Sequence, residues 1–209
     1  MKTLERNVER VVAVSDERLD EAVRVLASAF TDYPVFTFVL PPETADRDRK
    51  LTAVMRYYAW RRLARGWPLL GVEVNGELQA VIAANPPHDG SQPAGVEAQE
   101  QHLFEVLGEL AETRRRAYES ASGGDFPDVP YFFIGMIGVS PEARGAGYAA
   151  RLMHEIHARA QAHPLAQGVA LCTESESNLA FYDRLGYAIT GSAEVDGLQS
   201  WSLWRENDA

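Results

Sequence analysis

The turn Arg144-Gly145-Ala146-Gly147-Tyr148-Ala149 is the stretch of this sequence best suited to chemistry. It follows the apolar segment 131–139 and opens a segment with helical periodicity. Its two glycines allow backbone conformations that other residues avoid, so consecutive N–H groups at the start of a helix can converge on one anion. We expect a phosphate group as the ligand.

Two common phosphate-binding motifs fit this turn poorly. A Walker A loop ends in Gly-Lys-Ser/Thr, whereas Gly147 is followed by Tyr148. Residues 145–150 do match the dinucleotide pattern G-x-G-x-x-A, and Glu174 lies beyond the next predicted strand. However, Pro141 lies between the strand and the turn, and the remaining chain is too short for the later strands of that fold. A dinucleotide-binding protein is therefore a distant alternative.

The segments before the turn predict helices and one hairpin. Ser15-Asp16 offers a cap for an amphipathic helix that ends at Phe30. Asn75-Gly76 favours a type I' turn between two strands. Further helices are expected over 45–65 and over 96–118, the latter with one face formed by Leu103, Val106, Leu107, Leu110 and Ala111.

The segments around and after the turn predict a sheet with a central strand. Residues 131–139 are apolar on both faces, which is typical of a central strand. The helix after the turn buries Ala149, Leu152, Met153, Ile156 and Ala160. The rest of the chain predicts strands over 168–173, 187–190 and 198–204, with a short helix over 177–185 that ends at Gly186.

Composition indicates a soluble globular protein. Thirty acidic and twenty basic residues give 209 residues a net charge of −10, which disfavours nucleic acid as a partner. No apolar run is long enough to span a membrane, and no secretory signal is evident, so a cytoplasmic location is expected. Cys172 reads as a buried small hydrophobe, and the cluster 114–116 reads as solvated surface.

Two blocks in this order resemble the GNAT superfamily of acetyltransferases. The first is Ile137-Gly138-Val139-x-Pro141-x-x-Arg144-Gly145-x-Gly147-x-Ala149, and the second is Asn178-Leu179-Ala180-Phe181-Tyr182-x-x-Leu185-Gly186-Tyr187. The resemblance covers residues 131–190, and the preceding helix, helix, hairpin pattern agrees with it. The phrase AFYDRLGYAI and the closing tryptophan strand loosely resemble the puromycin-type branch.

The resemblance implies an α/β fold with a splayed mixed sheet of about seven strands and acetyl-CoA in the gap. Backbone groups of Ile137, Gly138 and Val139 would bind the pantetheine amides, as a neighbouring strand would. The pyrophosphate would lie on the helix N-terminus. The residues implied there are Arg144, Gly145, Ala146, Gly147, Tyr148 and Ala149, with Asn178 as a further cofactor contact or as a helix cap.

The resemblance also implies a general acid. Tyr182 matches the family position beside the sulfur, and a tyrosine hydroxyl can protonate a departing thiolate. The general base is less clear, because the puromycin-type pattern has an acidic residue before a threonine and here Glu174 follows Thr173. Glu174 is the first candidate, Glu73 or a water chain is an alternative, and either glutamate could be a surface carboxylate.

The acceptor is expected on the side formed by segment 31–38, the hairpin and the last strands. Asp32, Tyr33 and Phe36 are the candidate substrate-binding residues, although core packing is the favoured explanation for each aromatic residue taken singly. His154 and His157 lack a third ligand and read as surface residues, so no metal is expected.

The sequence thus predicts one domain over 1–209. Its acceptor side would be formed by residues 8–125 and its acetyl-CoA side by residues 130–205. The predicted function is N-acetyl transfer from acetyl-CoA to a primary amine of a small molecule or peptide, in a ternary complex. A non-catalytic acyl-CoA-binding or regulatory module on the same fold is the alternative, and a homodimer is left open.

Overall fold

The computed structural model describes residues 8–88, 90–122 and 124–208. Residues 1–7, on which the expectation about a secretory signal rests in part, lie outside the described residues. Across the described ranges, no helix combines the length and the apolar character that a membrane crossing requires.

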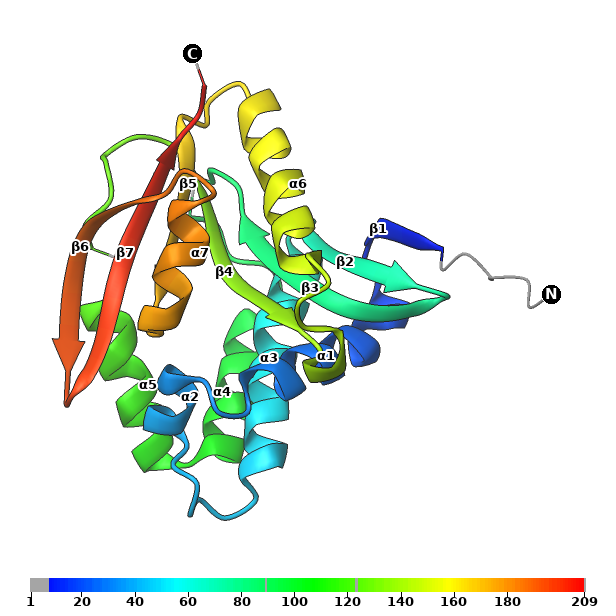
Figure 1. Ribbon diagram of the computed structural model, residues 1–209. Coiled ribbons are helices and arrows are strands. Elements are labelled where there is room, and N and C mark those ends of the chain that lie inside the picture. The colour runs from blue at the N-terminus through cyan, green and yellow to red at the C-terminus, as the bar shows by residue number, and fades with distance from the viewer. Residues whose placement is uncertain (1–7, 89, 123, 209) are drawn as a thin grey trace.

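Seven strands form one mixed sheet in the order β1-β2-β3-β4-β5-β7-β6 (Figure 1). Only β4 and β5 pair in parallel, and the other neighbours are antiparallel. This topology confirms the predicted fold class and rules out the dinucleotide-binding alternative, whose sheet is mostly parallel. The strands are β1 Glu9–Ala13, β2 Leu69–Val74, β3 Glu77–Asn85, β4 Phe132–Val139, β5 Gly168–Thr173, β6 Ala188–Val195 and β7 Leu198–Glu206.

Helices cover both faces of the sheet, so two apolar cores form. One core lies between the sheet and α1 to α5, and the other lies beneath α6 and α7. Adjacent β3 residues divide between them: Val81 packs into the first core and Ile82 into the second, because side chains alternate along a strand. The helices are α1 Leu19–Phe30, α2 Pro34–Val39, α3 Arg47–Ala64, α4 Val96–Leu107, α5 Glu109–Ala121, α6 Tyr148–Ala162 and α7 Leu179–Asp183.

Most predicted elements are present, with three corrections. The predicted helix over 96–118 is two helices, because Gly108 adopts φ 81° and ψ 165° and ends α4. Leu110, expected on the buried face, is 66% exposed after this break. Ser15 precedes a 3-10 helix (Asp16–Arg18) without a side-chain capping bond, and the predicted helix over 177–185 is a 3-10 turn (Glu176–Asn178) followed by α7. The Asn75-Gly76 turn is confirmed by positive φ at both residues.

A β-bulge at Gly135 shifts the side-chain alternation of β4 by one residue, so that residues after the bulge change the face of the sheet on which they lie. Ala83 pairs with Met136 and Ala84 with Ile134, which leaves Gly135 as the extra residue. Ile134 consequently packs into the core beneath α6, whereas Met136 packs into the core with α1 and α3. Gly135 and Met136 therefore both lie on the α1–α5 side, where the site described below is found.

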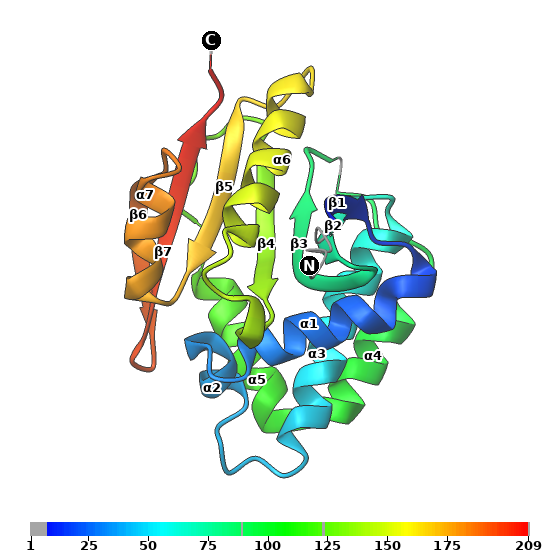
Figure 2. The ribbon, with the colours of Figure 1, turned by 45° about the vertical axis from the view of Figure 1, so that its right-hand side comes forward.

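Strands β4 and β5 separate after three residue pairs. Pairing runs from Phe132–Val169 to Ile134–Leu171 and then stops, although β4 continues to Val139 (Figure 2). The β5-facing edge of Met136–Val139 thus has no strand partner among the described residues. The predicted splay of the sheet is confirmed.

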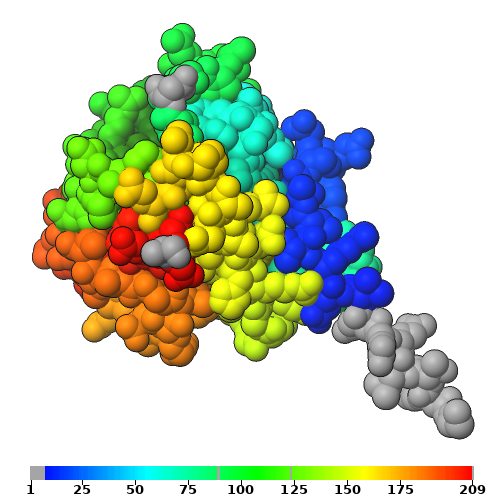
Figure 3. Space-filling view, turned by 90° about the horizontal axis from the view of Figure 1, so that it is seen from above, coloured from blue at the N-terminus to red at the C-terminus, as the bar shows by residue number. Residues whose placement is uncertain are grey.

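The C-terminal end of the chain fastens α6 to the edge of β5. The Asn207 amide donates hydrogen bonds to the carbonyl oxygens of Ala160 and Ala166 at 3.0 and 2.9 Å. Seen from above, the chain end and α6 form one continuous surface (Figure 3). This contact holds the C-terminal end of α6, at the end of the helix opposite the glycine turn.

Candidate active site

The turn after β4 is an open backbone loop. Gly145 and Gly147 both have φ 83°, a conformation that strains other residues, and a Cβ on either would meet no protein atom within 4 Å. The loop is largely exposed, and α6 begins directly after Gly147. The amides of the first turn of α6 therefore face solvent with the positive end of the helix dipole, as an anion site requires.

Three side chains around this loop make contacts that the sequence did not predict. The Arg144 guanidinium reaches the carbonyl oxygen of Ala29 at 3.5 Å and is otherwise exposed. The Tyr148 hydroxyl donates to Glu9 at 3.0 Å, and Arg151 also contacts Glu9. Tyr148 and Arg151 thus tie α6 to β1, so Tyr148 has only its backbone amide to offer an anion.

Gly138 lets helix α1 pack against the end of β4. A Cβ at this position would lie 2.8 Å from the Ala29 Cβ and 3.3 Å from the Leu26 Cδ2. Leu26 is fully buried, and its neighbour Ala29 packs against the same core. The glycine therefore allows α1 to pack closely against β4 beside the splayed edge.

A cavity of about 330 Å³ lies where β4 and β5 separate. Helices α1, α2, α3 and α5 close it on one side, and β4, β5 and α7 contribute the other. Its walls are mainly aromatic and aliphatic, which suits a small organic ligand. Tyr33, Phe36, Glu174, Asn178 and Tyr182 all contribute to the lining.

Six of the predicted site residues thus line one cavity, and the others do not. Ile137 also lines it, whereas Asp32 is exposed outside the lining. Asn178 makes no side-chain cap on α7, and its amide instead lies 3.4 Å from the Thr173 hydroxyl. Cys172 is half-buried and lines the same cavity, so the description as a buried hydrophobe was only partly right.

Glu174 is buried and hydrogen-bonded rather than a surface carboxylate. It is 8% exposed, and its Oε1 accepts hydrogen bonds from the Tyr118 hydroxyl at 2.6 Å and the Ser200 hydroxyl at 2.9 Å. Burial raises the pKa of the Glu174 carboxyl, and the hydrogen bonds from Tyr118 and Ser200 oppose that rise. A carboxyl with a raised pKa is a stronger base, nearer to the pH at which it would act.

Tyr33 fixes the backbone that carries Glu174. Its hydroxyl shares a hydrogen bond of 2.9 Å with the Thr173 hydroxyl and accepts one of 3.2 Å from the Glu174 amide. Burial, followed by the charge of Glu174, raises the pKa of Tyr33. The hydroxyl therefore remains protonated and holds α2 against the end of β5.

Tyr182 comes from α7 and is 6% exposed. Its ring packs edge-on to Tyr187 with centroids 5.8 Å apart. Burial is the main cause that raises the pKa of Tyr182, and the Glu174 carboxylate adds to it. Within the described ranges, its hydroxyl has no hydrogen-bond partner, so it keeps a proton that it can donate to a ligand.

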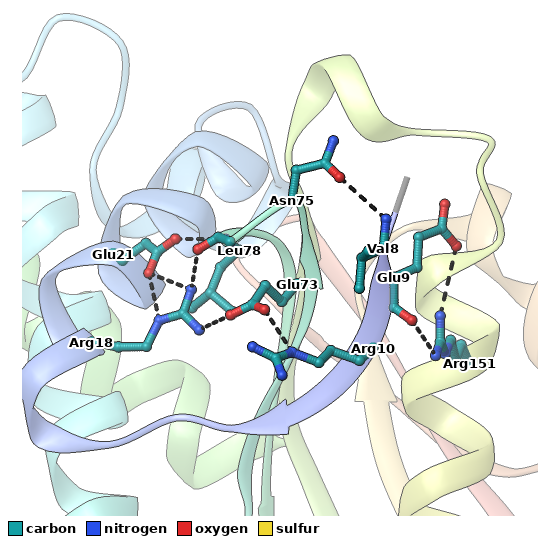
Figure 4. Close-up of polar contacts among 10 residues, drawn as sticks. Val8, Glu9, Arg10, Arg18, Glu21, Glu73, Asn75, Leu78 and Arg151 are labelled. Atoms are coloured by element: carbon teal, nitrogen blue, oxygen red, sulfur yellow. Dashed lines mark hydrogen bonds and ion pairs between the residues drawn. The ribbon is translucent and has the colours of Figure 1, made fainter. Parts of the chain in front are cut away.

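Glu73, the alternative base, belongs to a different cluster. Its carboxylate pairs with Arg10 at 2.7 Å and with Arg18 at 2.5 Å, and Arg18 also pairs with Glu21 (Figure 4). Hydrogen bonds from Arg10 and then Arg18 lower the pKa of Glu73. Glu73 does not line the cavity, and a lowered pKa makes it a weak base, so its role is to join β1, β2 and the start of α1.

Two surface predictions are wrong. His157 is buried and its Nε2 lies 2.9 Å from the Tyr187 hydroxyl, whereas His154 is exposed as predicted. Arg115 is held by Glu112 and Glu119 and lines the cavity. Among the residues that the structure describes, no cluster of three or more His, Cys, Asp or Glu residues could hold a metal ion.

Tyr118 and Ser200 are site residues that sequence reasoning missed. They lie 56 residues before and 26 residues after Glu174, on α5 and β7. No local pattern marks either residue, because each reaches Glu174 only through the fold of its own element. From the sequence alone, a tyrosine near the end of a helix would be interpreted as a packing residue.

Comparison with known proteins agrees with this geometry. Residues 100–189 match the model of the acetyltransferase (GNAT) domain, a span that contains the turn and Tyr182. These residues are similar to the GNAT domain, and the predicted resemblance to that superfamily is confirmed. The looser likeness to the puromycin-type branch stays a prediction.

Solved structures show the same fold along nearly the whole chain. A structure titled histone acetyltransferase HPA2 and related acetyltransferase, from Corynebacterium glutamicum, is 20% identical with a TM-score of 0.73, covering 96% of this chain and 97% of its own. Arylalkylamine N-acetyltransferase 2 from Aedes aegypti is 15% identical (TM-score 0.63; coverage 97% and 100%). A GNAT family acetyltransferase from Brucella melitensis in complex with acetyl-CoA is 16% identical (TM-score 0.51; coverage 93% and 96%).

Proposed function

We propose that this protein transfers an acetyl group from acetyl-CoA to a primary amine in a ternary complex. The observation that carries the proposal is that Glu174 and Tyr182 line the same cavity, next to the point where β4 and β5 separate. Glu174 can accept a proton, and Tyr182 can donate one. Acyl transfer from a thioester to an amine needs both.

The cofactor would lie along the splayed edge of the sheet. The unpaired backbone of Ile137, Gly138 and Val139 would bind the pantetheine arm as an added strand. Arg144 and the amides from Gly145 to Ala149 would bind the pyrophosphate. The acetyl end would then enter the cavity beside Tyr182, where Asn178 also lies.

The reaction would depend on an ionised Glu174 and a protonated Tyr182. The hydrogen bonds from Tyr118 and Ser200 both go to Oε1 of Glu174, so Oε2 would be the atom that takes the acceptor's proton. The neutral amine attacks the thioester carbonyl, a C–N bond forms, and Glu174 takes the proton from nitrogen. The C–S bond then breaks, and Tyr182 donates its proton to the leaving thiolate, which gives an amide and CoA.

The acceptor would bind between α2 and the opposing helices. Tyr33 and Phe36 would contact it directly, whereas Asp32 would act at most at the cavity entrance. A cavity of about 330 Å³ favours a small molecule or one terminal residue of a peptide. One of the similar structures is named for arylalkylamine acceptors, which have this combination of an amine and an apolar body.

Two measurements test the proposal. Calorimetry should detect acetyl-CoA binding at micromolar concentrations, and a panel of primary amines with thiol detection should show CoA release for at least one member. Absence of acetyl-CoA binding at high micromolar concentration would refute the cofactor assignment. Binding without turnover across a broad panel would instead favour an acyl-CoA-binding module.

A further inference from the structure

One wall of the cavity contains a buried guanidinium with almost no protein partners. Arg62 on α3 lines the cavity and is 6% exposed. Its Nη1 donates one hydrogen bond of 3.1 Å to the carbonyl oxygen of Tyr58, and its buried Nε has no hydrogen-bond partner within the described part of the chain. A buried charge normally has a counter-charge, because leaving water costs several kcal/mol.

No carboxylate among the described residues forms an ion pair with Arg62, and the nearby ones are engaged elsewhere. Glu112 and Glu119 bind Arg115, with nitrogen to oxygen distances of 2.7 and 2.6 Å. Glu119 also accepts a hydrogen bond from the Tyr58 hydroxyl. Arg115 therefore has two acidic partners on its own helix, whereas Arg62 lines the same cavity with a backbone carbonyl as its only acceptor among the described residues.

The electrostatic surroundings of Arg62 increase its need for an anion. Burial, together with the neighbouring charges of Arg61 and Arg65, lowers the pKa of Arg62 to about 10. The side chain is nevertheless protonated at neutral pH. The ring of Tyr58, 5.7 Å from the guanidinium carbon, offers only a weak cation–π contact.

The bulge on β4 makes the space for this guanidinium. A Cβ at Gly135 would lie 2.4 Å from Nη2 of Arg62. Gly135 is the residue that the β3–β4 register leaves unpaired, and it lines the cavity next to Met136. The absence of a side chain at this position therefore lets the guanidinium sit against β4 within the cavity wall.

We propose that Arg62 binds a carboxylate of the acceptor, so that the acceptor is an amine that also carries a carboxylate on an apolar body. A carboxylate can take two hydrogen bonds from one guanidinium at once, so the part of Arg62 that lines the cavity suits such a group. Aromatic side chains that line the same cavity would contact the apolar body; these are Phe30, Tyr33, Phe36 and Phe133. The amine half of this assignment rests on the proposed function, whereas the carboxylate site does not.

Ligand binding tests the carboxylate site without any turnover. The probes are 3-phenylpropionate and its neutral amide, titrated by calorimetry into protein saturated with CoA. We expect wild type to prefer the carboxylate, and Arg62→Met to weaken its binding by about 10- to 100-fold while changing amide binding less than about twofold. Equal binding of the two probes to wild type, or equal loss of both in the variant, would overturn the proposal.

Two further variants guard against indirect effects. Arg61→Met makes the same charge change on the same helix, but Arg61 binds Gln92 and does not line the cavity, so probe binding should not change. Gly135→Ala displaces the guanidinium and leaves residue 62 intact. Gly135→Ala should reproduce the selective loss of carboxylate binding. It therefore tests the proposal even if Arg62→Met does not fold.

Acetylation assays separate this proposal from the proposed function. Wild type should acetylate phenylalanine with a higher kcat/KM than phenethylamine, and Arg62→Met should reverse the order. Carboxylate binding that depends on Arg62, without acetylation of any amine, would leave the anion site standing and refute the transferase. Acetylation of amines with no preference for the carboxylate would refute the anion site alone.

Discussion

The Tyr118 hydroxyl on α5 donates a hydrogen bond of 2.6 Å to Oε1 of Glu174, which lies 56 residues further along the chain. Burial raises the pKa of Glu174, and this bond opposes the rise because it favours the charged carboxylate. Tyr118 is thus placed to set the pH at which Glu174 can act as a base.

Replacing Tyr118 should therefore move a pH profile. Tyr118→Phe removes the hydrogen bond, so the pKa of Glu174 should rise further and the acid limb of kcat/KM should shift to higher pH. The rate on the alkaline side should change little. Tyr57→Phe is the matched control, because Tyr57 is also buried and bonded to a glutamate, Glu100, but does not line the cavity. An unchanged acid limb in Tyr118→Phe would contradict this positioning role.

Glu174→Gln should lower activity and raise stability. Loss of the base should reduce kcat by about 10²- to 10⁴-fold. The native state holds the Glu174 carboxyl with a raised pKa, so ionising it costs folding free energy at neutral pH and not in acid. The variant should melt at a higher temperature at pH 8, by about 2–4 °C for each kcal/mol gained, with the difference shrinking near pH 4.

Glu73→Gln provides the opposite case. The pKa of Glu73 is lowered by Arg10 and Arg18, so its charge stabilises the native state above its unfolded pKa, and that contribution disappears as the pH falls through its native value. This variant should lose stability at neutral pH and keep its kcat. A kcat as low as that of Glu174→Gln would make Glu73 the base after all.

Tyr182→Phe tests the general acid. The variant keeps the ring that packs on Tyr187, so acetyl-CoA affinity should stay within about twofold while kcat falls by about 10²- to 10⁴-fold. Tyr187→Phe removes a neighbouring buried hydroxyl that faces His157 instead of the cavity, and its kcat should not change. A fully active Tyr182→Phe enzyme would exclude this proton donor.

Gly147→Ala tests the phosphate turn. A Cβ at φ 83° costs about 1–2 kcal/mol of strain, and it would project into the space expected for the pyrophosphate. We expect acetyl-CoA affinity to fall by about tenfold or more. Gly76→Ala places a Cβ at φ 94° in the β2–β3 turn, with equally open surroundings, so it should cost similar stability without loss of affinity. Equal affinities in both variants would argue against cofactor binding at this turn.

His157 should make the protein sensitive to acid. Burial lowers its pKa to about 4 from the ordinary 6.5, because the neutral ring is favoured in the native state. The stability that this provides is complete above pH 6.5 and declines as the pH falls toward 4, by a total on the order of 3 kcal/mol. His157→Gln should flatten the urea-unfolding free energy between these pH values. A slope equal to that of wild type would assign the acid sensitivity to other groups.

Local patterns in the sequence were enough for most of the elements and for the glycine turn before α6. The order of strands and helices follows from apolar periodicity, and the hairpin follows from Asn75-Gly76, because these signals act within a few residues. The turn at Gly145 and Gly147 is equally local, since backbone groups and not distant side chains form it. The break at Gly108 was missed because apolar spacing continues across it.

Only the tertiary structure decided the chemistry inside the cavity. The residues that orient Glu174 come from α5 and β7. Arg62 reaches the cavity from α3 past Gly135, the extra residue of the β4 bulge, which has no side chain to block it. Glu73 and Glu174 look alike in the sequence, yet one is bound by two arginines and the other is buried among hydroxyls. Solvent exposure and charged neighbours set a carboxyl's pKa, and both are properties of packing that no short stretch of sequence contains.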